Sequence, residues 1–128
     1  MRQITVVMVG FGRMGSRFFE KITEAGKEKV RILAVCELNS DNPNLDVVKQ
    51  SGIEISNNYE EVIERFGSDC DIILDTTNVP DIKYNIRKTL ALQGNNHTVL
   101  VPMVVDYLMW YLLPGNEPIP QDHISIGY

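Results

Sequence analysis

Residues 4–15 of the chain read Ile4-Thr-Val-Val-Met-Val9-Gly10-Phe-Gly12-Arg-Met-Gly15, and this stretch decides the fold. The apolar run before the first glycine predicts a buried strand, and the residues after the third glycine predict a helix. Gly10 permits a sharp turn, Gly12 lets backbone N–H groups approach a phosphate, and Gly15 lets the helix pack closely on the strand. The order of strand, glycine turn and helix therefore indicates a site for a dinucleotide pyrophosphate at the helix N-terminus.

Strands and helices alternate along the rest of the sequence. Apolar runs predict five strands, at residues 4–9, 30–38, 53–56, 71–75 and 97–101. Helical periodicity and capping residues predict helices at residues 13–25, 45–50 and 59–66, and a further one beginning at Pro80. Connections of this length imply parallel pairing with right-handed crossovers. We therefore expect an α/β, doubly wound parallel sheet of the Rossmann type with strand order 3-2-1-4-5, whose ligand crevice lies at the carboxyl ends of strands one and four.

Length and composition predict a single domain over residues 1–128 of this 128-residue chain. Residues 1–103 form its expected Rossmann core, and residues 104–128 an apolar helix and a proline-rich tail. The formal net charge of −5 argues against nucleic acid as a general partner. The sequence contains neither a signal peptide nor an apolar run near the ~20 residues of a membrane span, so a cytoplasmic protein is expected.

Cysteine and histidine usage gives no indication of a metal site. Cys36 and Cys70 sit in apolar segments and are expected to be buried, reduced thiols. His97 and His123 are isolated from each other and from the cysteines, which leaves no metal-ligand spacing.

Glu37 follows the apolar part of the second strand, and its position bears on the choice of cofactor. A carboxylate there can accept hydrogen bonds from both adenosine ribose hydroxyls and would repel a 2′-phosphate. No Arg or Lys follows directly, so NAD(H) is favoured over NADP(H). The distance from the glycines exceeds the usual ~20 residues, which the turn at residues 27–29 would explain. A solvated carboxylate at a strand end is the alternative interpretation.

Residues at two further positions complete the predicted cofactor site. Arg13, at the helix start, can lie against the pyrophosphate or over the adenine. Residues 76–78 leave the fourth strand where strand order reverses, and they suit contact with ribose or nicotinamide; equally, Thr and Asn are ordinary strand-end and capping residues. The predicted site is Gly10, Phe11, Gly12, Arg13, Met14, Gly15, Glu37, Thr76, Thr77 and Asn78.

The sequence offers no acid/base pair for catalysis. His97 begins a strand on the side away from the crevice and is interpreted as structural. Lys83 and Lys88 are expected to be solvated on the outside of their helix. The catalytic residues, if any exist, are therefore unknown from the sequence.

The chain resembles the amino-terminal cofactor domain of dihydrodipicolinate reductases in Gly12-Arg-Met-Gly15, in Glu37 and in Asp75-Thr-Thr-Asn-Val-Pro80. It is also similar to the corresponding domains of homoserine dehydrogenases and of the glucose-fructose oxidoreductase/inositol dehydrogenase family. The resemblance spans about residues 1–103. It implies an NAD(P)-binding domain in which the glycine turn holds the pyrophosphate, Glu37 the ribose, and residues 76–78 form the crevice edge.

Three departures from these families stand out. The reductases tend to have one more residue in the glycine turn. The sugar oxidoreductases usually carry Glu-Lys-Pro where this chain has Val101-Pro102-Met103, so their catalytic lysine is absent. All these families bind substrate in a following domain, whereas here only residues 104–128 follow the fifth predicted strand, and we expect no such domain.

Residues 104–113 are almost wholly apolar and predict a helix with more hydrophobic surface than one sheet can cover. Homodimerisation, or docking on a partner subunit, is the preferred interpretation; simple packing under residues 114–120 is the alternative. Residues 123–128 alternate apolar and polar side chains and could add a short edge strand.

Three functional hypotheses follow from these patterns. The first is an NAD(H)-binding module with a binding, sensing or subunit role. The second is an oxidoreductase whose substrate site is completed by a dimer partner or another chain, with Tyr107 or His123 as a proton donor. The third keeps the fold but places another adenine nucleotide in the crevice.

Overall fold

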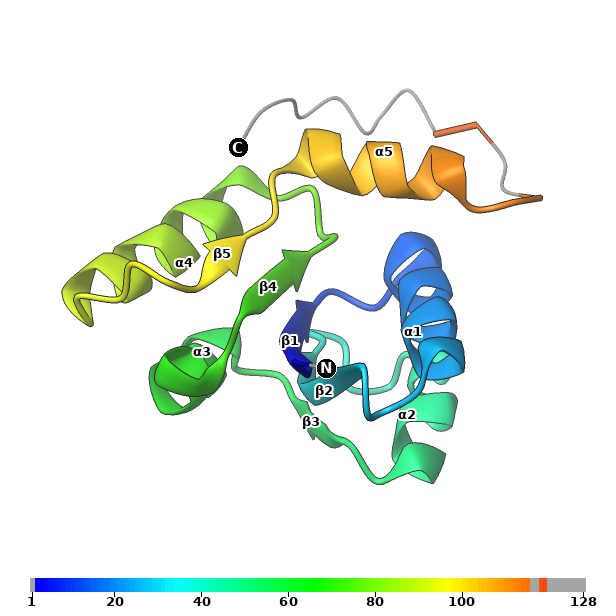
Figure 1. Cartoon of the computed structure of the whole chain (residues 1–128), viewed down its shortest axis with the longest axis horizontal. Coiled ribbons are helices and arrows are strands. Elements are labelled where there is room, and N and C mark those ends of the chain that lie inside the picture. The colour runs from blue at the N-terminus through cyan, green and yellow to red at the C-terminus, as the bar shows by residue number, and fades with distance from the viewer. Residues whose placement is uncertain (1, 116–117, 120–128) are drawn as a thin grey trace.

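The computed structural model of the chain describes residues 2–115 and 118–119, and its centre is a five-stranded parallel sheet (Figure 1). The strand order is β3-β2-β1-β4-β5, and every described pair of neighbouring strands is parallel. The strands are β1 (Ile4–Val9), β2 (Val30–Cys36), β3 (Glu54–Ser56), β4 (Ile72–Asp75) and β5 (Val99–Leu100). The prediction of a Rossmann-type, doubly wound sheet is therefore confirmed.

Helices cover both faces of this sheet (Figure 1). The helices are α1 (Arg13–Ala25), α2 (Asp46–Ser51), α3 (Tyr59–Phe66), α4 (Pro80–Leu92) and α5 (Met103–Leu112), with short 3-10 turns η1 (Pro43–Leu45) and η2 (Gly67–Asp69). Helices α1 and α2 lie on one side and α3 and α4 on the other, while α5 runs across the top of the view near α1 and β4. None of the described helices is long and apolar enough to cross a membrane.

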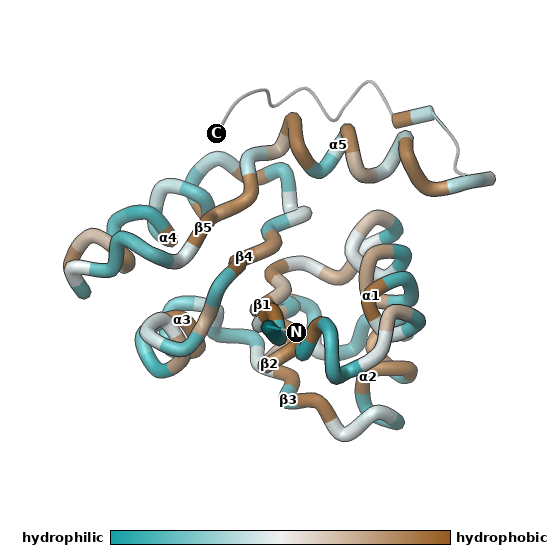
Figure 2. The backbone as a smooth tube through the Cα atoms, viewed as in Figure 1, coloured by the Kyte–Doolittle hydropathy of each residue, from teal (hydrophilic) through white to brown (hydrophobic). Residues whose placement is uncertain are grey.

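The sheet separates two hydrophobic cores, as the two-sided burial of a central parallel strand requires. Along β1, Val6 and Met8 face the core beneath α1, whereas Val7 and Val9 face the core beneath α3 and α4. Figure 2 shows mostly hydrophobic residues along the strands, and both polar and hydrophobic residues along the helices. Each large apolar side chain removed from water in this way contributes about 1.5–3 kcal/mol.

Four strands are shorter than the sequence predicts, and the difference is largest for β2 and β5. The second strand ends at Cys36, and the backbone pairing continues only through the N–H of Glu37, which donates to Ser56 O at 2.9 Å. The fifth strand begins at Val99 because Thr98 is occupied in the preceding turn, where its hydroxyl bonds to Gly67 O and Cys70 O. Side-chain hydrogen bonds of this kind compete with the ladder, and they are invisible to hydrophobic periodicity.

A one-residue bulge in β2 helps to set the position of Glu37. Val6 is opposite Ile32, but the next residue, Val7, is opposite Ala34, so Leu33 is an extra residue in the second strand. A bulge exchanges the faces of all following side chains. The longer spacing between the glycines and Glu37 therefore includes this bulge, in addition to the predicted lengthening of the turn.

Helix α5 has one buried and one exposed face. Met103, Asp106 and Trp110 are buried at helical spacing. Its exposed side carries large apolar residues, namely Val104, Val105, Leu108, Tyr111 and Leu112. The edge strand predicted at residues 123–128 lies outside the described residues, as does His123.

Candidate functional site

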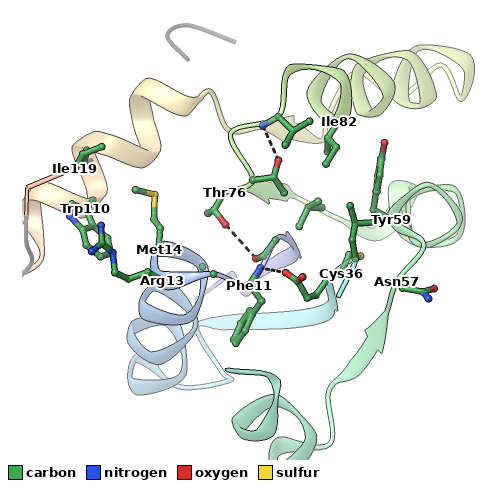
Figure 3. A pocket seen from close by; sticks show the side chains of 18 residues that line it. Phe11, Arg13, Met14, Cys36, Asn57, Tyr59, Thr76, Ile82, Trp110 and Ile119 are labelled. Atoms are coloured by element: carbon green, nitrogen blue, oxygen red, sulfur yellow. Dashed lines mark hydrogen bonds between the residues drawn. The ribbon is translucent and has the colours of Figure 1, made fainter. Parts of the chain in front are cut away.

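A pocket of about 350 Å³ opens at the carboxyl ends of β1, β2 and β4 (Figure 3). This is the edge of the sheet at which strand order reverses on either side of β1, and open α/β sheets bind their ligands there. The pocket is lined by the glycine turn, by the ends of β1 and β2, by the turn after β4, and by residues of α3, α4, α5 and the segment beyond it. Its lining residues include Gly10, Phe11, Gly12, Arg13, Met14, Gly15, Glu37, Asn57, Tyr59, Thr76, Thr77, Val79, Trp110 and Ile119.

The three glycines of the turn have different geometric reasons to be glycine. Gly10 has φ of 91°, a left-handed conformation that favours glycine, and a Cβ there would lie 2.8 Å from Thr77 Cγ2. A Cβ on Gly15 would lie 2.5 Å from Gly10 O, so the first turn of α1 touches the glycine loop directly. A Cβ on Gly12 would meet nothing within 4 Å. Gly12 therefore borders open space, as the approach of a phosphate to the backbone requires.

Glu37 lies at the rim of the pocket and bonds to the glycine turn. Its Oε1 accepts the N–H of Phe11 at 2.9 Å, and its Oε2 accepts the N–H of Asn39 at 2.9 Å. Each carboxylate oxygen can accept more than one hydrogen bond, so these contacts orient the side chain and leave both oxygens able to accept a further hydrogen bond. The carboxylate is half-buried and fixed, unlike the solvated strand-end carboxylate of the alternative interpretation.

The turn after β4 packs against the same glycine loop. Thr76 is buried, and its hydroxyl donates to Gly10 O at 3.3 Å. Asp75 Oδ1 accepts from both the N–H and the hydroxyl of Thr77, at 2.9 and 2.7 Å. Asn78, a predicted site residue, does not line the pocket; it has φ of 57°, and lies between Thr77 and Val79, which do.

Arg13 and Trp110 form one wall of the pocket (Figure 3). The Arg13 guanidinium lies over the Trp110 ring at 5.7 Å from its centroid, within the range of a cation–π interaction. Phe18 meets the same ring edge-on at 6.3 Å. Trp110 and Ile119 were not predicted as pocket residues, because periodicity assigns them to a helix and a tail but does not place either segment beside the crevice.

The opposite wall includes Asn57 and Tyr59 at the start of α3 (Figure 3). Tyr59 is the first residue of α3, and its hydroxyl accepts a hydrogen bond from Asn85 Nδ2 at 3.0 Å. In the sequence, the indication that these two residues line the pocket is their position after the third strand, since the residues that follow the strands of a doubly wound sheet border the crevice.

The charges around the pocket are few. Among its described lining residues, Glu37 is the only carboxylate and Arg13 the only permanent cation. Burial raises the pKa of the Cys36 thiol to about 12, with further upward shifts from Glu54 and Glu61. A thiol of that pKa is protonated and unreactive at neutral pH. Both cysteines are buried and free, and no metal-binding cluster occurs within the part of the chain that the structure describes.

The prediction for Lys83 is wrong, while Lys88 is exposed as expected. Lys83 is 1% exposed, and its ammonium forms an ion pair with Asp75 Oδ2 at 3.0 Å. It also donates to Val101 O at 3.0 Å and to Asp75 O at 3.4 Å. Lys83 precedes Ile86 by three residues and Leu90 by seven, so it lies on the same buried face of α4. This spacing was visible in the sequence, but the positive charge of Lys83 led to the prediction that it is solvated.

Asp106 of α5 is a second buried ionisable residue that was not predicted from the sequence. Its side chain is fully buried, and within the described part of the chain neither carboxyl oxygen has a hydrogen-bond partner. Burial raises its pKa to about 8, with Lys83 opposing the shift and Asp75 adding to it. Tyr107, one of the two proton donors considered, does not line the pocket.

The sheet order, the glycine turn after β1 and the pocket at the strand ends define a Rossmann-type α/β domain. Within this class, the chain belongs to the family described as dihydrodipicolinate reductase, N-terminus, which it matches over residues 4–100. A comparison with curated proteins gives no match.

Among solved structures, the chain is similar to RSP, crystallised in complex with β-NAD+ and operator DNA. The TM-score is 0.53 and the sequence identity 17%. The match covers 84% of this chain and 54% of that one, so the chain spans about half the length of that protein. At this identity the likeness concerns the fold.

Proposed function

We propose that this chain binds NAD(H) in the pocket at the carboxyl ends of β1, β2 and β4, in a binding, sensing or subunit role. The observation that carries the proposal is the contact between Glu37 Oε1 and the N–H of Phe11 at 2.9 Å. This contact places a carboxylate suited to binding a ribose beside a turn suited to binding a pyrophosphate, in one pocket. A site for a phosphate group alone would need only the turn, so the added carboxylate favours a dinucleotide.

In the proposed arrangement, the pyrophosphate lies over Gly12 and the N-terminus of α1, where open space meets backbone N–H groups. The adenosine ribose lies at Glu37, and the nicotinamide end lies toward the turn after β4. The residues proposed to contact the cofactor are Gly10, Phe11, Gly12, Arg13, Met14, Gly15, Glu37, Thr76, Thr77 and Asn78. Asn78 would reach the ligand from beside the pocket, since it is not among the lining residues.

The preference for NAD(H) over NADP(H) rests on charge. Glu37 would lie beside a 2′-phosphate and repel it, whereas the guanidinium of Arg13, the permanent cation among the described lining residues, lies over the Trp110 ring (Figure 3). The crystal complex of the similar protein RSP with β-NAD+ is consistent with this choice. That complex also holds operator DNA, but the net charge of −5 keeps nucleic acid outside the proposal for this chain.

A second candidate is an oxidoreductase whose substrate site is completed by a partner, favoured by membership of a reductase family. Two ionisable side chains of the described pocket bear on proton transfer: Cys36 has a strongly raised pKa, whereas the Tyr59 hydroxyl accepts a hydrogen bond from Asn85 and keeps its own proton to donate. In this candidate function a partner chain completes the substrate site.

Calorimetric titration with NADH, NADPH, ATP and AMP tests these proposals together. We expect NADH to bind more tightly than NADPH, and AMP to bind more weakly than either dinucleotide. Preference for ATP or AMP would point to another adenine nucleotide as the ligand. The absence of measurable binding by both dinucleotides would refute the NAD(H) and oxidoreductase proposals.

A further inference from the structure

A buried ion pair lies behind the crevice, outside the residues that line it. Asp75 ends β4 and Lys83 lies in the first turns of α4, and both are almost fully shielded from solvent. The Lys83 ammonium lies 3.0 Å from Asp75 Oδ2 and donates to Val101 O at 3.0 Å. It thus ties together the carboxyl ends of β4 and β5. The proposed function makes no use of this pair.

The two oxygens of Asp75 have separate partners. Oδ2 faces Lys83, while Oδ1 accepts both the N–H and the hydroxyl of Thr77. The Thr77 hydroxyl in turn accepts the N–H of Val79 at 3.3 Å. The turn that follows β4 is therefore folded around a carboxylate whose other side is held by Lys83.

This turn is in close contact with the glycine loop. The position of a Cβ on Gly10 lies 2.8 Å from Thr77 Cγ2, and Thr76 donates to Gly10 O. Thr76, Thr77 and Val79 all line the pocket. Because packed contacts transmit small shifts, any rotation of the Asp75 carboxylate would move a wall of the pocket and press on the glycine turn.

We propose that Lys83 is a positioning residue of the cofactor site: its ammonium fixes the Asp75 carboxylate, which holds Thr77 in place against the glycine turn. The inference rests on the proposed NAD(H) function and adds a residue to it that does not touch the ligand. A stabilising role alone would be a weak explanation, since buried ion pairs can often be replaced by apolar residues without loss of stability.

The test compares Lys83→Met with Lys88→Met, a matched change of an exposed lysine on the same helix. Dissociation constants for NADH and melting temperatures are measured for both variants and for the unaltered chain. We expect Lys83→Met to weaken NADH binding roughly tenfold, in line with the loss of one buried polar contact, and Lys88→Met to change nothing. An unchanged dissociation constant in folded Lys83→Met would overturn the inference, whatever the melting temperature does.

A double-mutant cycle separates positioning from general damage. Thr77→Val keeps the shape of the side chain and removes the hydroxyl that Asp75 holds. If Lys83 acts through Thr77, the dissociation constant of the variant carrying both changes should be about the same as that of the single variant that binds NADH less tightly. Fully multiplicative losses would mean that the two residues act independently, which contradicts the proposed route.

Asp75→Asn provides a second measurement should Lys83→Met fail to fold. Asparagine has one oxygen, which cannot serve both Lys83 and Thr77, so a similar loss of affinity is expected and unaltered affinity would overturn the inference. If the unaltered chain binds no NADH, it is the proposed function that has failed. If it binds while the variants bind equally well, only the role of Lys83 has failed.

Discussion

Glu37 both faces the proposed ribose site and holds the N–H of Phe11, and two substitutions separate these roles. Glu37→Ala should weaken NADH binding about tenfold and reduce discrimination against NADPH, because it removes the ribose acceptor and the charge that repels a 2′-phosphate. Glu37→Gln keeps an acceptor for Phe11 but loses the charge, so it should chiefly improve NADPH binding. Titration of each variant with both dinucleotides measures the effect, and unchanged selectivity would remove Glu37 from the site.

Asp106 gives the stability of the fold a dependence on pH. Its folded-state pKa of about 8 lies above the ordinary value of 3.8, because burial opposes ionisation. Between about pH 4 and pH 8 the Asp106 carboxyl is therefore protonated in the folded chain and ionised in the unfolded chain. The free energy of unfolding falls as pH rises through that window. The slope from this residue is at most about 1.4 kcal/mol per pH unit.

Asp106→Asn should remove this contribution. Compared with the unaltered chain, the variant should gain stability steadily from about pH 4 to pH 8 and gain little more above that. Denaturant unfolding at several pH values gives the difference. Using the difference cancels the opposing influence of Asp71 and Glu54, whose pKa values are lowered mainly by a Thr5 backbone hydrogen bond and by Arg65, respectively. A difference that does not vary with pH would contradict the assignment.

At the scale of an element, the turn from β1 into α1 separates requirements of folding from requirements of binding. Gly15→Ala places a methyl group 2.5 Å from Gly10 O, so either the backbone shifts or α1 moves away from the loop. We expect a loss of about 1–3 kcal/mol in unfolding free energy, as in other overpacked sites.

Gly12→Ala is the matched control within the same turn. Its methyl group meets nothing within 4 Å, and its backbone φ of −80° suits alanine, so the melting temperature should hardly change. The methyl group would nevertheless occupy the space proposed for the pyrophosphate, so NADH affinity should fall at least about tenfold. Full affinity in this variant would place the phosphates elsewhere.

The sequence predicted these elements well because each leaves a local mark. Glycine spacing defined the turn, and two-sided burial marked β1 as a central strand. The charge of Lys83 led to its prediction as solvated despite its spacing, and its partners Asp75 and Val101 lie on other elements that only the assembled fold brings together. Asp106 escaped prediction because only the assembled fold shows that its carboxyl group is buried without a hydrogen-bond partner among the described residues. Trp110 escaped for a related reason, since no local rule fixes the direction in which α5 leaves β5.

At the scale of the whole molecule, the exposed face of α5 bears on assembly. Leu108 and Leu112 are 56% and 72% exposed, beside other apolar residues of the same helix. Such a face usually marks an interface, and we propose that two copies of the chain pair through it. The unaltered chain should then sediment as a dimer at micromolar concentration.

Leu108→Glu should convert that dimer into a monomer, because an unpaired carboxylate would be buried at the interface. Leu92→Glu changes a leucine on α4 that is even more exposed than Leu108, and it should leave the dimer intact. Analytical ultracentrifugation of the three proteins measures the outcome. A monodisperse monomer for the unaltered chain would exclude this role for α5.

The position of Trp110 in the pocket wall beside Arg13 also has an optical consequence. The chain contains one tryptophan, and that residue is 4% exposed in the wall of the proposed cofactor pocket. Its emission therefore originates at the site itself, without background from other indoles. The reduced nicotinamide ring absorbs at wavelengths where indole emits, so bound NADH should quench Trp110 by energy transfer while NAD+ should not. The protein thus carries a built-in spectroscopic probe that distinguishes the redox state of its ligand without any added label.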